Sequence, residues 1–143
     1  MTFFVDANVF VYSATRGEYR QACSGAIRAI ARGDGLGRTS TAALEEVWFT
    51  EWRGQAGNLD GLTARAHAVM APLLPVTDDI FRRALALDAP SAGTNDRLHA
   101  ATCLANDIEV ILSADTDFDD IPGVRRVDPL ARDEVAQLLG EQP

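Results

Sequence analysis

The sequence contains no lysine, so all 13 basic side chains among its 143 residues are arginines. Against these stand 21 aspartates and glutamates, which give a formal net charge of −8 at pH 7. A surface of this sign repels phosphate-rich polymers, which excludes a general electrostatic attraction to nucleic acid. If the substrate is a polyanion, a local group must reverse the sign at its binding site.

Cysteine is also scarce, and long hydrophobic runs are missing. Cys23 and Cys103 show no C-x-x-C spacing, so a disulfide scaffold is excluded and both thiols are expected to be reduced core residues. Asp6 interrupts the apolar N-terminus, and no uncharged apolar run approaches the roughly 20 residues that a membrane span requires. The N-terminus has neither a basic leader nor a small-residue cleavage site, which predicts a cytoplasmic protein without membrane association.

The length and the apolar fraction of 47% are those of one compact domain, which we expect to cover residues 1–143. Strand and helix patterns alternate along it. The β-favouring runs lie at residues 3–5, 36–39, 73–76, 110–112 and 124–127. Helices are predicted at residues 8–14, 18–32, 41–53 and 94–106, along the stripe of Leu62, Ala66 and Val69, after a Thr77 cap, and after Asp128 as N-cap with Pro129. This alternation predicts an α/β sandwich with a mainly parallel sheet of about five short strands.

Two of the predicted strands end in a carboxylate. Asp6 directly follows the strand at residues 3–5, and Asp115 comes just after the strand at residues 110–112. Each acid taken alone is equally well explained as a helix N-cap. Because ligand sites of parallel sheets lie beyond the carboxyl ends of the strands, two such acids at one edge predict a functional site.

Further acids are expected at the same edge, because helices that follow parallel strands begin where those strands end. Glu46 and Asp96 lie near the starts of two predicted helices, and Asp117 lies two residues beyond Asp115. Two carboxylates 4 Å apart repel by about 4 kcal/mol at an effective dielectric constant near 20. Protonation or hard cations relieve this repulsion, and oxygen-only ligands select Mg²⁺ or Mn²⁺. A bound divalent ion would also reverse the local sign for a polyanion.

Four segments of the chain resemble, in order and at the usual spacing, the motifs of PIN-domain nucleases. They are Phe4-Val5-Asp6-Ala7-Asn8, Thr39-Ser40 with Leu44-Glu45-Glu46-Val47, Asn95-Asp96-Arg97-Leu98-His99-Ala100-Ala101, and Ser113-Ala114-Asp115-Thr116-Asp117-Phe118. The size and the leaderless start further resemble the VapC-type toxins of bacterial type II toxin–antitoxin systems.

This resemblance implies a PIN-like three-layer α/β/α fold and an Mg²⁺- or Mn²⁺-dependent endoribonuclease that hydrolyses RNA phosphodiesters. The implied catalytic acids are Asp6, Glu46, Asp96 and Asp115. The implied metal ligands are Asp6, Asp96, Asp115 and Asp117, with Asn8 and Ser113 supporting the site. The implied partners are an RNA substrate, a cognate antitoxin protein and a second copy of the chain in a homodimer.

The second motif leaves two neighbouring acids to choose from. Glu45 and Glu46 are about 100° apart on a helix, so only one can face the site. The six-residue step from Ser40 and the following Val47 favour Glu46, which makes Glu45 a solvated surface acid.

Other assignments stay open between a functional and a structural interpretation. Arg16, Arg97 and His99 are candidate substrate contacts, although surface arginines and a packed histidine are the simpler interpretation. Trp48, Phe49 and Trp52 form either part of the core or a surface for an antitoxin helix or a second subunit. The alternative to an enzyme is a catalytically weak PIN-fold module that binds RNA or a protein without turnover.

Overall fold

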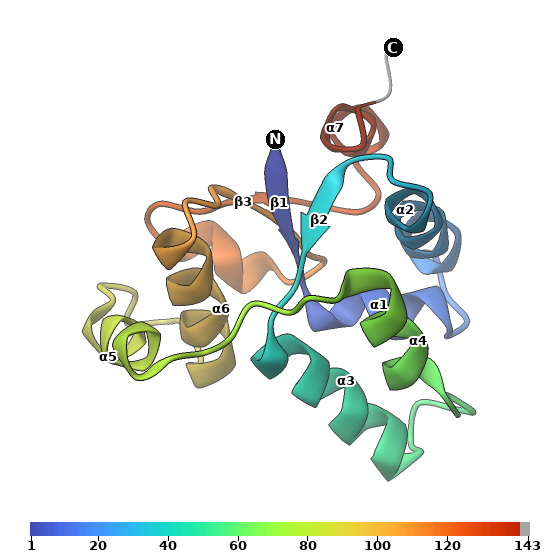
Figure 1. Cartoon of the computed structure of the whole chain (residues 1–143), viewed down its shortest axis with the longest axis horizontal. Helices are drawn as coiled ribbons and strands as arrows, with labels where there is room; N and C mark the ends of the chain where they lie inside the picture. The colour runs from blue at the N-terminus through green and yellow to red at the C-terminus, as the bar shows by residue number, and fades with distance from the viewer. Residues whose placement is uncertain (141–143) are drawn as a thin grey trace.

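The computed structural model describes residues 1–140, in which seven α-helices surround a four-stranded sheet (Figure 1). The elements are β1 (Thr2–Val5), α1 (Ala7–Ser13), α2 (Arg20–Ala31), β2 (Leu36–Arg38), α3 (Thr41–Arg53), α4 (Leu62–Met70), α5 (Asp78–Ala86), α6 (Thr94–Ala105), β3 (Val110–Leu112), the 3₁₀-helix η1 (Thr116–Asp120), β4 (Arg125–Val127) and α7 (Arg132–Leu138).

The sheet is parallel throughout, with the strand order β2-β1-β3-β4. β1 lies at its centre, where Phe4 pairs with Arg38 of β2 and with Ile111 of β3. Strands β1 and β3 are therefore neighbours that point the same way, although they are more than 100 residues apart in the sequence. Their carboxyl ends meet at one edge of the sheet, as the sequence predicted.

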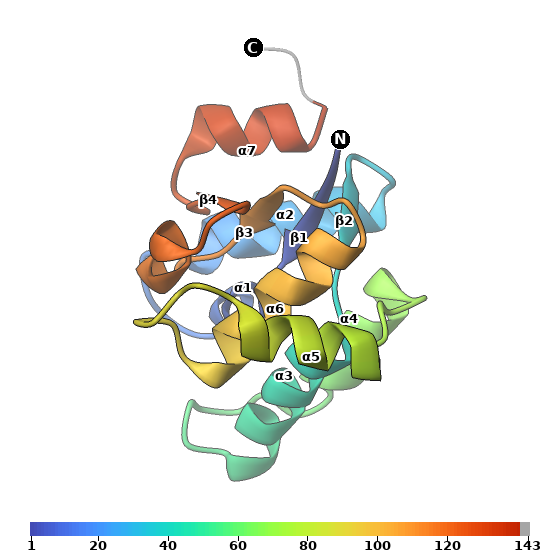
Figure 2. The same cartoon turned by 90° about the vertical axis from the view of Figure 1, so that its left-hand side faces the viewer.

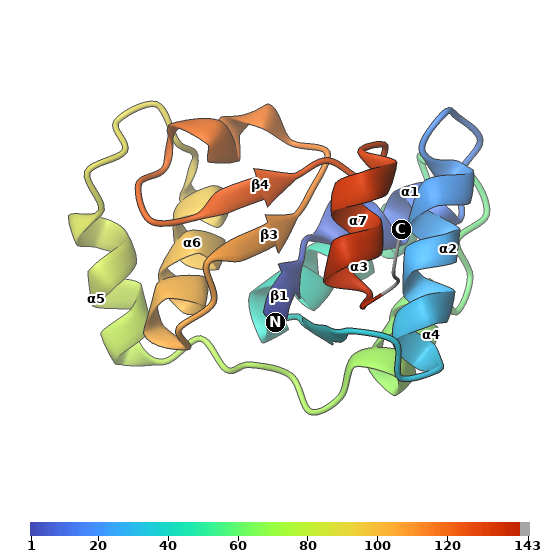
Figure 3. The same cartoon turned by 90° about the horizontal axis from the view of Figure 1, so that it is seen from above.

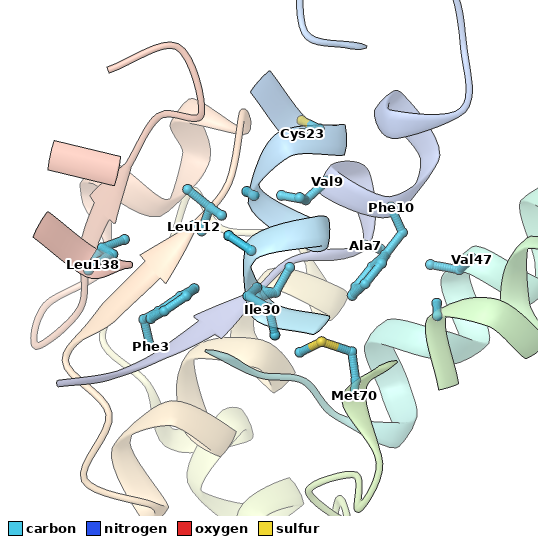
Figure 4. Close-up of a cluster of buried hydrophobic side chains, with 14 of the residues drawn as sticks. Phe3, Ala7, Val9, Phe10, Cys23, Ile30, Val47, Met70, Leu112 and Leu138 are labelled. Atoms are coloured by element: carbon cyan, nitrogen blue, oxygen red, sulfur yellow. The ribbon is translucent and has the colours of Figure 1, made fainter. Parts of the chain in front are cut away.

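Helices cover both faces of this sheet, so the predicted three-layer α/β/α arrangement is confirmed (Figures 2 and 3). Because side chains alternate along a strand, Phe3 and Leu112 pack on the side of α1, α2 and α7 (Figure 4). Phe4 and Ile111 point the other way, against α6 and η1. Helix α5 packs on the outside of α6. The sheet and α6 together fix the positions of the strand-end acids.

The fifth strand, predicted at residues 73–76, is not formed. This segment makes only an isolated parallel bridge between Leu74 and Ser40. Pro72 and Pro75 have no backbone N–H group, so the segment lacks the donors that a longer ladder requires.

The predicted start of the last helix is also wrong, because α7 begins at Arg132. The carboxylate of Asp128 instead accepts a hydrogen bond from the backbone N–H of Leu130 at 2.8 Å, which forms a turn ahead of the helix. Thr77, by contrast, caps α5 as predicted, because its hydroxyl accepts from the N–H of Ile80 at 3.2 Å.

The aromatic side chains of α3 lie on the surface rather than in the core. Trp48, Phe49 and Trp52 are 64%, 49% and 77% exposed, so their interpretation as core residues is wrong. Cys23 and Cys103 are buried free thiols, as expected. Among residues 1–140, no helix combines the length and the apolar character needed to cross a membrane.

Candidate active site

Asp6 stands at the junction between β1 and α1 and is 4% exposed. Its Oδ1 accepts a hydrogen bond from the N–H of Ala7 at 2.8 Å, so it does cap α1. Its Oδ2 accepts from Ser113 Oγ at 2.6 Å and from Asn8 Nδ2 at 3.1 Å. Burial raises the pKa of Asp6, while the His99 charge and the Ser113 hydrogen bond act in the opposite direction. Asp6 therefore caps α1 and is also a buried carboxylate whose orientation is fixed by hydrogen bonds to both of its oxygens.

Ser113 joins the ends of β1 and β3. Besides donating to Asp6, its hydroxyl oxygen accepts from Asn8 Nδ2 at 3.1 Å and from the N–H of Asp115 at 3.0 Å. Asn8 completes the connection, because its Oδ1 accepts from the N–H of Ala114 at 3.3 Å. Both predicted supporting residues thus lie between Asp6 and Asp115 and fix their separation.

Asp96, Asp115 and Asp117 form one group of acids, contributed by α6 and by the turn that opens η1. One carboxylate oxygen from each lies within 4.8 Å of the others. The carboxylate of Asp115 also accepts from the N–H of Asp117 at 2.9 Å, which orders the turn. Partial burial, followed by the charges of Asp115 and Asp6, raises the pKa of Asp96 to about 6. A cation placed among these three acids would relieve their mutual repulsion.

Asp6, Glu46 and His99 form a second group, again within 4.8 Å of one another. His99 Nε2 lies 2.9 Å from Glu46 Oε1 and 3.7 Å from Asp6 Oδ1. Burial lowers the pKa of His99, but the Glu46 hydrogen bond and the neighbouring acids outweigh it and raise the pKa overall. Because Asp6 and Asp115 both act on the pKa of Asp96, the two groups make one electrostatic cluster.

The choice between Glu45 and Glu46 is visible in the geometry of α3. Glu46 points toward Asp6 and His99, whereas Glu45 is exposed and lines a shallow surface pocket with the aromatic residues of α3. Glu46 is thus the acid that joins the cluster, as the sequence favoured.

The three candidate substrate contacts differ in their exposure and in their hydrogen bonds. His99 is 1% exposed and lies packed beneath the surface, and a contact with substrate stays a prediction. Arg16 is exposed in the connection between α1 and α2, beside Tyr12 and Tyr19. The structure shows no contact between Arg16 and the acids, and its role stays a prediction.

Arg97 is occupied by structural hydrogen bonds. Its guanidinium donates to the backbone carbonyls of Leu87 at 2.8 Å, Ala89 at 2.7 Å, Ala92 at 3.3 Å and Ala84 at 3.4 Å. These bonds hold the connection between α5 and α6. These bonds give Arg97 a role in positioning this segment, and its contact with a phosphate stays a prediction.

The sequence analysis did not predict the hydrogen bonds that two residues, His99 and Arg126, make at the site. His99 was predicted only as a candidate substrate contact, and its pairing with Glu46 was missed, since nothing local marks a histidine that pairs with a residue on another helix. Arg126 donates to Ser113 O and Asp128 Oδ2, both at 3.1 Å, and makes a bidentate pair with Asp119. It therefore ties η1 to the end of β3. The only sequence signal was an arginine inside a predicted strand.

The donor set fits a hard divalent cation. The cluster offers five carboxylates, of Asp6, Glu46, Asp96, Asp115 and Asp117, against one imidazole. Oxygen donors of this kind suit Mg²⁺ or Mn²⁺.

A comparison with known protein families agrees with this arrangement. The sequence model of the PIN domain matches residues 3–124. The chain belongs to the PIN domain family. The matched range contains all five acids of the cluster, and PIN domains are typically nucleases. No curated protein sequence matches the chain significantly.

Solved structures share the fold of this PIN domain at low sequence identity. A chain of VapBC2 from Rickettsia felis, crystallised with a DNA fragment from their promoter, is 13% identical, with a TM-score of 0.68 over 90% of this chain and 98% of that one. VapC20 from Mycobacterium tuberculosis, described as a Sarcin-Ricin loop cleaving toxin, is 19% identical, with a TM-score of 0.63 and coverage of 82% and 92%. PAE2754 from Pyrobaculum aerophilum is 12% identical, with a TM-score of 0.63 and coverage of 99% and 97%.

Proposed function

We propose that this PIN domain is an Mg²⁺- or Mn²⁺-dependent endoribonuclease and the toxin of a toxin–antitoxin pair. The observation that carries the proposal is the convergence of five carboxylates from four separate parts of the chain on one edge of the sheet. A cluster this acidic is costly to maintain, so a catalytic use for it is the simplest reason that it is present.

The side chains divide into holding and supporting groups. Asp6, Asp96, Asp115 and Asp117 would hold the ion, and Glu46, beside Asp6, would supply a further carboxylate to the same site. A bound Mg²⁺ or Mn²⁺ supplies Lewis-acid stabilisation of charge on a phosphodiester and reverses the local sign. Asn8 and Ser113 keep Asp6 oriented through their hydrogen bonds to Oδ2. Either Asp96 or Asp115 would orient the attacking water.

RNA is the proposed substrate class. One solved structure with this fold is described as a toxin that cleaves the Sarcin-Ricin loop, which is the support for RNA over DNA. The net charge of −8 fits a substrate that is recruited at the metal-loaded site alone. Catalysis on cellular RNA would place the protein in the cytoplasm.

An antitoxin protein and a second copy of the chain are the proposed protein partners. Another solved structure with this fold is a VapBC assembly. In the present chain, the exposed aromatic face of α3 (Trp48, Phe49 and Trp52) offers apolar area that a monomer leaves in water. A label-free test is co-purification with the product of the neighbouring open reading frame, compared between wild type and Trp52→Ala.

The catalytic proposal is tested by RNA cleavage with the purified chain. Mn²⁺ or Mg²⁺ should support cleavage, EDTA should abolish it, and Asp6→Asn should lower the rate by about 10²–10³-fold because a held acid is lost. Glu45→Gln is the matched control, since it removes an exposed acid next to Glu46 and should leave the rate unchanged. RNA binding without turnover in the presence of either ion would instead support the non-catalytic module.

A further inference from the structure

Within residues 1–140, His99 is the one imidazole in the acidic cluster, and its position is fixed from three sides. Its Nε2 lies 2.9 Å from Glu46 Oε1, and its ring packs against Phe4 and Phe118 at centroid distances of 5.6 Å and 6.5 Å. Helix α6 thereby reaches across to α3 through the contact between His99 and Glu46. We propose that His99 is a positioning residue, whose Nε2–H group holds the Glu46 carboxylate in place for the metal site. This role rests on the proposed metal-dependent function.

The location of the ring protons follows from what each nitrogen faces. Nδ1 is buried and has no hydrogen-bond partner within residues 1–140, whereas Nε2 faces the carboxylate of Glu46. A neutral imidazole has one N–H group, and placing it on Nε2 satisfies the Glu46 oxygen. In a protonated ring Nε2 also carries a proton. In both states Nε2 donates to Glu46.

The same geometry argues against His99 as a direct metal ligand. Ligation through Nε2 requires a bare nitrogen, which moves the remaining proton of the neutral ring to Nδ1. Ligating histidines almost always donate that second N–H to a carboxylate, a carbonyl or water. Nδ1 faces no acceptor in the described part of the chain, so ligation would bury an unsatisfied donor. His99 therefore acts on the metal through Glu46.

The backbone of Glu46 is fixed in the middle of α3, but its side chain can rotate about three bonds. A hydrogen-bond donor is therefore needed to hold the carboxylate in one position. In the described part of the chain, His99 is the hydrogen-bond donor to its carboxylate, and the Glu46 side chain is 26% exposed. Without the imidazole, repulsion from Asp6 would turn the carboxylate outward into water. Its contribution to metal binding would then fall.

The first test compares three variants of the full chain in metal-free buffer by calorimetric titration with Mn²⁺. His99→Leu keeps an apolar filling but removes the donor, and should lower Mn²⁺ affinity by about 10–100-fold. His99→Gln replaces Nε2–H with an amide N–H at a similar reach, and should stay within about threefold of wild type. His67→Leu changes the other histidine, which is exposed, and is the control that should bind as wild type does.

The Glu46→Gln background shows whether His99 acts through Glu46. There, His99→Leu should change Mn²⁺ affinity by less than about twofold, because the two effects are not additive. Wild-type affinity in folded His99→Leu, or the same loss in both backgrounds, overturns the positioning role and leaves the proposed function standing. If the wild-type chain binds neither ion, the proposed function fails, and the role of His99 falls with it.

The second test needs no substitution at His99. The chain has two histidines, so ¹⁵N spectra of labelled imidazoles contain one signal set from His99 and one from His67 as reference. We expect the His99 Nε2 proton to remain in place after saturation with diamagnetic Mg²⁺. Loss of that proton with a large Nε2 shift would make His99 a ligand and refute the proposal even if His99→Leu does not fold.

Discussion

Replacing Asp96 with asparagine should stabilise the metal-free protein, although it removes a candidate ligand. The pKa of Asp96 is raised from 3.8 to about 6 by partial burial and by the charges of Asp115 and Asp6. At pH 7.5 the folded protein therefore carries an ionised group in an environment that disfavours it. Asparagine keeps the shape of the side chain and removes this penalty.

The size of the effect follows from the shift. One pKa unit corresponds to about 1.4 kcal/mol, so a shift of about two units gives about 3 kcal/mol as an upper limit. Asp96 is only half-buried, and solvent screening reduces the expected gain to roughly 1–2 kcal/mol. For a chain of this length the gain corresponds to a rise in Tm of roughly 3–6 °C.

The stability gained by Asp96→Asn depends on pH. Because the folded-state pKa is raised, the folded protein keeps this proton between pH 3.8 and about 6, where the unfolded chain has released it. The penalty is absent below that window, grows through it and is complete above it. The gain from Asp96→Asn should therefore be largest at pH 7.5 and fall to about half at pH 5.0.

Urea unfolding followed by circular dichroism in EDTA measures this gain at the two pH values. Asp60→Asn is the control, because it removes the same charge from an exposed loop position away from the cluster. Saturating Mn²⁺ should reverse the order, since it stabilises wild type by about 2.7 kcal/mol at 100 times Kd and the variant by less. A variant no more stable than Asp60→Asn at pH 7.5, or a gain that persists unchanged at pH 5.0, would refute the reasoning.

Other predictions concern residues outside the acidic cluster. Arg97→Ala should lower the free energy of unfolding by roughly 1.5–3 kcal/mol, because it leaves the carbonyls between α5 and α6 without their donor. Arg82→Ala, whose ion pairs are exposed, should cost no more than about 1 kcal/mol, and equal costs for the two would contradict the assignment. Trp52→Ala should change the free energy of unfolding by less than about 0.5 kcal/mol, since its side chain is exposed, whereas Phe118→Ala should cost about 3–5 kcal/mol. A large loss on Trp52→Ala in urea titrations of the isolated chain would mean that α3 packs differently.

The fold and the acid positions were largely predictable, because they depend on local signals. Asp6 and Asp115 follow short apolar runs, and parallel strands bring their carboxyl ends to one edge without further information. Asp96 and Glu46 then follow from where the next helices start. The same logic failed at residues 73–76, where Pro72 just before the run and Pro75 within it lack the backbone donors that a strand needs.

Pairings across the chain were not predictable, because nothing near a residue marks its distant partner. His99 meets Glu46 from a separate helix, and the guanidinium of Arg97 turns back to carbonyls before its own helix. The sequence left Trp48 and Trp52 open between core and surface for a related reason. Aromatic composition predicts burial on average, but which side of α3 faces the core depends on how α4 and α6 pack against it.

Both tryptophans of the protein lie on the outer side of one helix, which gives the molecule a built-in optical signal. Indole rings already in water change their emission little when the chain unfolds, so fluorescence is a poor monitor of its melting. Covering α3 would instead move those rings into an apolar setting and shift their emission to shorter wavelength. The intrinsic tryptophan fluorescence of the unlabelled protein should therefore detect the binding of a partner to α3.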